Sequence, residues 1–89
     1  MKFNYNWLIK QLNFTIVYKE EPEGGYTVTV PSLPGCVTYG KDLKEAKKMA
    51  KDAIQLYVES LKEHGEEIPS DDSIFLSTVN IDPSLLGYA

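Results

Sequence analysis

The stretch DLKEAKKMAKDAIQLYVESLKEHG (residues 42–65) decides the fold that the sequence predicts. Its apolar residues recur every three or four positions, which is the spacing of one face of an amphipathic helix. These residues are Leu43, Ala46, Ala50, Ala53, Ile54, Tyr57 and Leu61. Asp42 and Glu45 form the spacing of a capping box, and Gly65 suits the left-handed position after a helix. The sequence therefore predicts one long helix from about Leu43 to His64.

Upstream of this helix the apolar residues alternate instead. Phe14 to Lys19 and Tyr26 to Val30 each switch between two faces, as half-buried antiparallel strands do. The loop EEPEGG (residues 20–25) between them is short and rich in turn residues, which predicts a hairpin. The prolines and glycine of PSLPG (residues 31–35) end the ladder. Cys36 to Tyr39 is then expected as a short third strand.

Downstream of the helix, a polar loop leads to Ser73 to Ile81, which is rich in apolar residues and is predicted as a fourth strand. The expected order is βββαβ, an α+β fold in which an antiparallel sheet carries the long helix on one face. We divide the chain into an N-terminal extension (residues 1–13), a domain (residues 14–81) and a C-terminal tail (residues 82–89). The extension fits either a strand or a short helix, and a strand is preferred.

Composition and charge indicate which partners and which cellular compartment to expect for the protein. The chain has 89 residues, a net charge of −4 and a pI of about 4.8, which argues against general binding to nucleic-acid phosphates. Cys36 is the only cysteine, so no internal disulfide is possible, and a small domain without one points to a reducing compartment. No apolar run approaches the roughly 18 residues of a membrane span. We expect a cytoplasmic protein without membrane contact.

The ingredients of catalysis are scarce. His64 is the only histidine and sits at the end of the helix, where a cationic side chain favours the helix dipole. Cys36 follows a turn, and no base that would activate its thiol can be assigned. Neither a zinc-ligand spacing nor a phosphate loop is present, and the cores of the first three strands carry no Asp or Glu for a two-metal site. We expect that the protein is not an enzyme and that it binds neither a metal ion nor a cofactor.

Two features point to binding instead. Lysines concentrate in the first half of the helix, where cations oppose the helix dipole. They form either an ordinary exposed face or a basic patch for an acidic partner or RNA. Aromatic residues, which are common in interface cores, include Trp7 outside the main unit. The candidate partner-interface residues are Trp7, Tyr39, Lys44, Lys47, Lys48 and Lys51.

Four motifs occur together in the order EGGY (residues 23–26), VPSLPGC (residues 30–36), GKDLKEA (residues 40–46) and Ile68-Pro69. This set resembles the HicB-like antitoxin family from about Phe14 to Pro69. The resemblance implies a partial RNase H-like fold of βββαβ type that lacks the nuclease carboxylates. It also implies a function, which is to bind and neutralise HicA, a small and usually basic mRNA-cleaving toxin. An acidic protein suits a basic partner.

The resemblance leaves alternatives open. Many members of the family add a C-terminal DNA-binding module, but only eight residues follow Ile81, so direct DNA binding is not expected. A standalone RNA-binding domain that uses the lysines is one alternative. A homo-oligomeric member without a toxin partner is another. A homo-oligomer is expected in every case, because small proteins often close exposed sheet edges by pairing with another chain.

Overall fold

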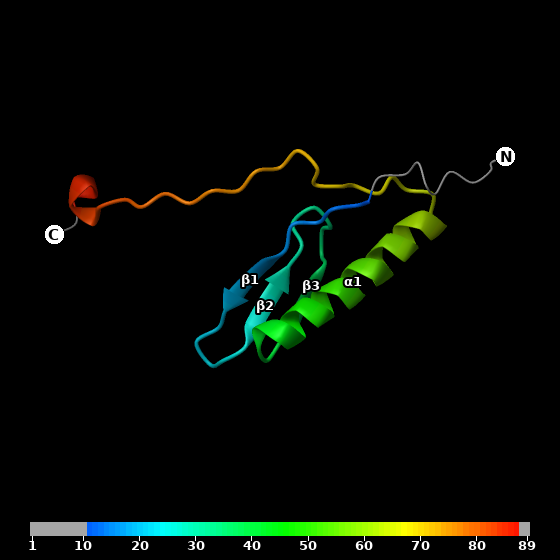
Figure 1. Cartoon of the computed structure of the whole chain (residues 1–89), viewed down its shortest axis with the longest axis horizontal. Helices are drawn as coiled ribbons and strands as arrows, with labels where there is room; N and C mark the ends of the chain where they lie inside the picture. Colours follow the sequence, from blue (N-terminus) through cyan, green and yellow to red (C-terminus); the bar gives the residue numbers. More distant parts are fainter. Residues whose placement is uncertain (1–10, 88–89) are drawn as a thin grey trace.

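The computed structural model describes residues 11–87 (Figure 1). Three strands come first, β1 (Val17–Glu20), β2 (Tyr26–Thr29) and β3 (Val37–Gly40). One long helix, α1 (Leu43–Glu63), follows, and a short 3-10 helix, η2 (Pro83–Leu86), lies near the C-terminus. The predicted α+β class, with three antiparallel strands and one long helix, is confirmed.

The sheet is antiparallel with the order β1-β2-β3, and Val28 at its centre pairs with Tyr18 and Thr38. The predicted hairpin therefore forms. β1 starts at Val17, three residues later than predicted. The next residue of β2 is Val30, whose amide donates to the Cys36 carbonyl (3.1 Å) and so faces β3. The following residue that would face β1 is Pro31, which has no amide to donate, so the β1–β2 ladder ends.

Helix α1 begins where the capping box predicts. The Asp42 carboxylate accepts from the Glu45 amide (2.8 Å), and Glu45 reaches back to accept from the Lys41 amide (2.7 Å). The helix ends at Glu63, one residue earlier than predicted. Gly65 follows with a φ of 67°, and the Glu66 amide donates to the Leu61 carbonyl (2.9 Å), which closes the last turn.

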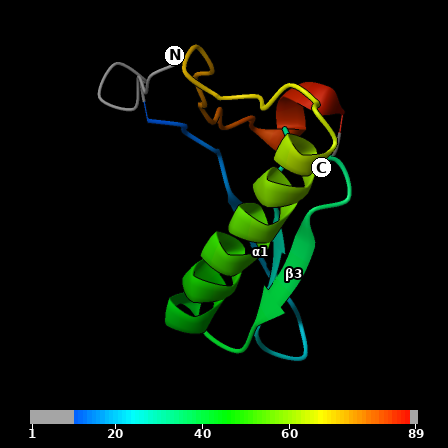
Figure 2. The same ribbon diagram turned by 90° about the vertical axis from the view of Figure 1, so that its right-hand side faces the viewer.

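The core lies between α1 and one face of the sheet (Figure 2). Ala46 and Ala50 of the helix pack on Val28, while Leu33 lies in a second cluster beneath the C-terminal half of the helix. Gly40 lets β3 and α1 approach closely, because any Cβ at that position would collide with the backbone of Ala46. The small residues of the motif GKDLKEA thus set the spacing between helix and sheet.

The predicted fourth strand is wrong for this structure, in which residues 73–81 form an irregular segment that we call the C-terminal arm. The arm runs away from the sheet (Figure 1), and its residues make no hydrogen bond with any other described residue. Phe75 is 91% exposed. A strand needs a neighbouring backbone to pair with, and the arm pairs with no strand within residues 11–87, so the observed order is βββα. Within the tail, Asp82 caps η2.

Candidate functional site

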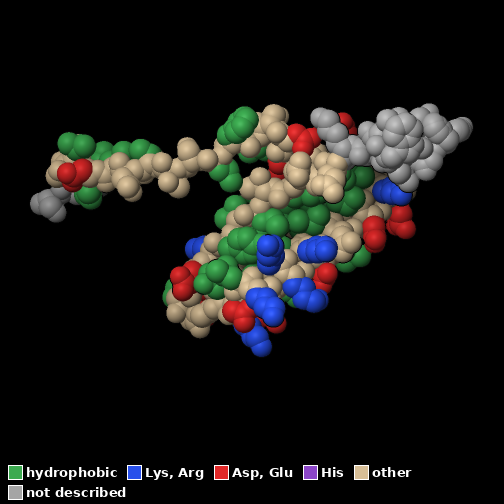
Figure 3. Space-filling view, viewed as in Figure 1, with side chains coloured by type: hydrophobic (Ala, Val, Ile, Leu, Met, Phe, Trp, Pro, Cys, Tyr) green, Lys and Arg blue, Asp and Glu red, His purple; other side chains and the backbone are tan. Residues whose placement is uncertain are grey.

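A groove of about 610 Å³ lies between the first half of α1 and the segment that leads into β1. We call it the lysine groove. Its apolar lining comes from Leu12, Phe14, Ile16 and Ile54, and its polar rim from Lys44, Lys47, Lys48, Lys51 and Gln55. In Figure 3 a band of apolar side chains runs beside the lysines of the helix. The structure therefore brings the four predicted lysines together around an apolar floor.

The groove follows from the way the helix sits on the sheet. The four lysines occupy positions i, i+3, i+4 and i+7 of the helix and so share one side of α1. The helix contacts β3 most and β2 less, which leaves the side of the sheet that carries β1 less covered. The sequence pattern identified the lysines but not the apolar floor. Phe14 and Ile16 were predicted as strand residues, and only the off-centre position of the helix leaves them open.

The charges on the rim are largely uncompensated. Lys48 pairs with Asp52 at 3.1 Å in an exposed i,i+4 contact, which contributes little to stability. Within residues 11–87, Lys44, Lys47 and Lys51 have no ion pair. A local positive potential therefore exists on a chain whose net charge is −4.

Tyr39 lies apart from the lysines. It alternates with the core-facing Thr38, so its side chain is on the sheet face away from α1. Its hydroxyl donates to the Gly24 carbonyl (3.0 Å), and the ring covers Gly25 in the β1–β2 turn. Tyr39 thus braces the hairpin. Trp7 lies outside the described residues, so the six predicted interface residues do not form one described surface.

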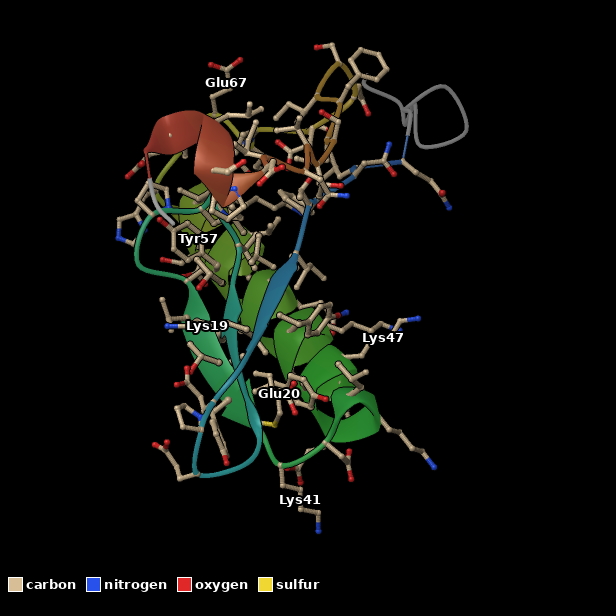
Figure 4. The ribbon with its side chains drawn as sticks, turned by 90° about the vertical axis from the view of Figure 1, so that its left-hand side faces the viewer. Lys19, Glu20, Lys41, Lys47, Tyr57 and Glu67 are labelled. Atoms are coloured by element: carbon tan, nitrogen blue, oxygen red, sulfur yellow. The ribbon has the colours of Figure 1, made fainter. Side chains whose placement is uncertain are left out.

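A second groove, of about 530 Å³, lies at the other end of the helix. We call it the acidic groove. It is lined by Ser32, Leu33, Pro34, Tyr57, Leu61, Glu66, Glu67, Pro69 and Ser70. The Tyr57 hydroxyl donates to the Pro34 carbonyl (2.7 Å) and ties α1 to the PSLPG turn. In Figure 4, Lys41, which precedes α1, lies at one end of the view, and Glu67, which borders the acidic groove, lies at the other. Sequence reasoning missed this groove, because it forms only when the loop after α1 packs beside that turn.

The chemically reactive side chains occupy structural positions. Cys36 is buried in the core, and burial raises the pKa of its thiol, which keeps the sulfur protonated and unreactive. His64 places Nδ1 2.7 Å from the Ser60 carbonyl at the helix end. The described residues contain no group of three or more His, Cys, Asp or Glu side chains that could hold a metal ion. Nor does any described helix have the length and apolar character needed to span a membrane.

The sequence profile described as "HicB_like antitoxin of bacterial toxin-antitoxin system" matches residues 14–84. The chain belongs to the HicB-like antitoxin family. The match includes the C-terminal arm, so the arm is part of the family's domain and not an added segment. Membership agrees with the resemblance carried by the four sequence motifs.

Similar proteins include members of several lineages. UPF0150 protein Ta0767 of Thermoplasma acidophilum is 47% identical over 62 residues, which cover 70% of this chain and 90% of that protein. Antitoxin HicB 1 of Photorhabdus laumondii is 34% identical over 67 residues, which cover 75% of this chain but 43% of the antitoxin. This chain thus matches less than half of that longer relative.

A solved structure supports the HicB-like fold. The N-terminal domain of the Burkholderia pseudomallei antitoxin HicB is 33% identical, with a TM-score of 0.57 over 82% of this chain and 78% of that domain. In this HicB-like chain the glycines of the motifs EGGY and VPSLPGC have architectural roles. Gly24 and Gly25 have φ values of 105° and 81° in the hairpin turn, and Gly35 has a φ of 82° before Cys36. Glycine is the residue that adopts these angles without strain.

Proposed function

We propose that this HicB-like chain binds and neutralises a small HicA-type mRNA-cleaving toxin. The family match over residues 14–84 carries the proposal, and the similarity to Antitoxin HicB 1 supports it. An antitoxin of this kind acts by covering its toxin and performs no reaction of its own. Such a function belongs in the cytoplasm, where mRNA is translated.

The acidic groove is the surface that suits this partner. The resemblance implies a basic toxin, and Glu66 and Glu67 border a groove that also presents the apolar side chains of Leu61 and Pro34. Interfaces combine an apolar centre with a charged rim, and opposite potentials speed association. The lysine groove has the wrong sign for a basic partner, so we place the toxin contact at the acidic groove.

Co-expression with a HicA-type toxin tests this function. The wild-type chain is expected to relieve the growth arrest that the toxin causes, and persistent arrest with soluble wild-type chain would reject the proposal. Glu66→Gln with Glu67→Gln is expected to weaken toxin binding about tenfold or more. Lys47→Gln with Lys48→Gln is the matched control, since it neutralises two exposed charges elsewhere on the molecule. Equal loss of binding in both pairs would remove the acidic groove as the contact.

The lysine groove supports a second candidate function, RNA binding. Three of its four lysines have no ion pair in the described part of the chain, and unpaired cations attract phosphates. Binding to short RNA should weaken with salt and fall when all four are changed to Gln. Absence of RNA binding at low salt would eliminate this candidate. A chain that assembles only with itself and captures neither toxin nor RNA would be a homo-oligomer without a partner.

A further inference from the structure

The C-terminal arm exposes an unusual amount of apolar surface. Its sequence, SIFLSTVNI (residues 73–81), carries no charge. Its large apolar side chains are all exposed, namely Ile74, Phe75, Leu76, Val79 and Ile81. Single chains rarely leave such a continuous apolar segment in water, and where they do it marks an interaction site. The arm therefore needs a surface to cover it.

The lysine groove offers a matching surface with an open edge. Among residues 11–87, only one side of β1 is paired, because β1 is the outer strand of the sheet. The segment before it, residues 14–16, has no strand partner in this part of the chain, and its Thr15 amide donates to the Asp71 side chain. An edge of this kind accepts an extended segment through main-chain hydrogen bonds, while the neighbouring apolar floor accepts its side chains.

We propose that the C-terminal arm of one copy adds as a strand beside residues 14–19 of a second copy and fills its lysine groove, in a reciprocal exchange between two chains. A twofold axis makes the two contacts identical. Each groove is then completed by residues that only the second copy supplies.

Length, polarity and charge agree with this occupant. The nine residues of the arm span about 30 Å when extended, enough to cover the six-residue edge, which spans about 20 Å. The arm is uncharged and apolar, as the groove floor requires, whereas RNA would use the lysines and leave Phe14 and Ile16 uncovered. Asp82 follows the arm immediately, and hydrogen bonds to Ser84 lower its pKa, so the arm ends in a negative charge, opposite in sign to the lysines of the rim.

The point where the arm leaves the body favours a second copy over the arm's own groove. The Asp71 amide donates to the Asn13 carbonyl (2.7 Å), and the Thr15 amide donates to the Asp71 carboxylate (2.8 Å). Asn13 Nδ2 also donates to Asp72 (2.8 Å). These bonds hold residues 71 and 72, directly before the arm, beside residues 13–15, and the arm then runs away from the sheet (Figure 1). To fill its own groove, the arm would have to change direction directly after these bonds.

Light scattering after size exclusion tests the exchange with matched variants of the full chain. The wild type is expected to be a dimer that dissociates on dilution. Leu76→Ser with Val79→Ser is expected to raise the dissociation constant at least tenfold while the helical circular dichroism stays unchanged. Leu85→Ser with Leu86→Ser is the control, because it makes the same change at exposed leucines of η2. A monomeric wild type, or equal effects of the two variants, would overturn the proposal.

Cysteine cross-linking identifies whose groove the arm fills. One chain carries Val17→Cys and the other carries Thr78→Cys or Val79→Cys. Since adjacent strand residues point to opposite faces, one of these two shares a face with position 17. Mixing the singly substituted chains under mild oxidation should give a disulfide-linked dimer. A chain with both substitutions that yields only an internal disulfide would show that the arm folds onto its own body, and the exchange would be wrong.

RNA is the competing occupant of the lysine groove, so RNA binding by the wild type and by the arm variant tests which of the two fills it. If the arm fills the groove, short RNA should bind the Leu76→Ser, Val79→Ser variant at least as tightly as the wild type at high protein concentration. An RNA-induced shift of the wild-type dimer to monomer, at unchanged circular dichroism, also fits an arm displaced from the groove. Tighter RNA binding by the wild type than by the variant would contradict a groove closed by the arm.

Discussion

The core and the C-terminal arm contain the same kinds of apolar residue, but these residues are buried in the core and exposed in the arm. Leu33 in the PSLPG turn is 1% exposed, whereas Leu76 in the arm is 74% exposed. Both lie outside the helices and strands of the structure. The difference is that Leu33 is held by local backbone bonds and covered by α1, while the arm makes no hydrogen bond to the rest of the described chain. Apolar character favours burial, but a second surface must be within reach for burial to occur.

Hydrogen exchange should show the largest contrast between the two regions. Amides of α1 and β2 are expected to exchange about a thousandfold or more slowly than amides of residues 74–81 in dilute protein, because only the former need global opening. Mass spectrometry after labelling measures this. At higher concentration the arm alone should gain protection if it pairs with a second copy. Equal protection of both regions in dilute protein would remove the contrast.

Truncating one leucine in each region should change the free energy of unfolding by different amounts. Leu33→Ala is expected to lower the free energy of unfolding by about 2–5 kcal/mol, through lost burial and a cavity. Leu76→Ala should leave the unfolding of dilute protein unchanged within about 0.5 kcal/mol. Urea denaturation followed by circular dichroism measures both. If Leu76→Ala destabilises the dilute chain as much as Leu33→Ala does, the arm is part of the core.

A side chain added at position 40 tests how closely β3 and α1 are packed. Gly40→Ala should lower the free energy of unfolding by about 1–3 kcal/mol, because the new Cβ would overlap the Ala46 backbone. Ser77→Ala in the arm adds no bulk to a packed contact and should be neutral. The same urea titrations apply. A neutral Gly40→Ala would mean that helix and strand can move apart freely.

The bonds at the arm's exit can be weakened without touching the core. Asp71→Ala removes the acceptor for the Thr15 amide and the Ser32 hydroxyl (3.3 Å), with an expected loss of about 1–2 kcal/mol. Glu67→Ala is the control, because it removes a nearby acid that holds neither group. With the exit released, internal cross-links between positions 17 and 79 should increase. An unchanged ratio of internal to intermolecular cross-links would show that Asp71 does not direct the arm.

The smallest expected effect concerns the Cys36 thiol and pH. Burial raises its pKa in the folded chain, so folding retains a proton that the unfolded chain releases above about pH 8.5. The contribution of the buried thiol to the free energy of unfolding is therefore fully present at neutral pH, and it declines as the pH rises through the pKa of the folded chain. Urea unfolding at pH 7 and pH 10 should show a larger drop for the wild type than for Cys36→Ala. Equal drops would mean that the thiol is not desolvated.

Much of the fold could be read from local patterns. The helix, its capping box, the hairpin and the third strand are confirmed to within a few residues, because each depends on neighbours in the sequence. The lysines of the candidate site were found in the same way, from their spacing on one helix face. The fourth strand was wrong, since apolar residues can predict a tendency to pair but not the presence of a partner. The acidic groove and the floor of the lysine groove were missed because distant segments build them.

By itself the sequence determined the family, the elements from Val17 to Glu63 and the lack of Asp or Glu in residues 14–19, 26–30 and 37–39. These properties are local, or depend on which residue types are present. The tertiary structure alone decided that α1 leaves the β1 side of the sheet open, that Tyr39 and the lysines lie on different surfaces, and that the arm leaves the body at Asp71. Each of these depends on contacts between segments far apart in the chain, whose geometry no local pattern encodes.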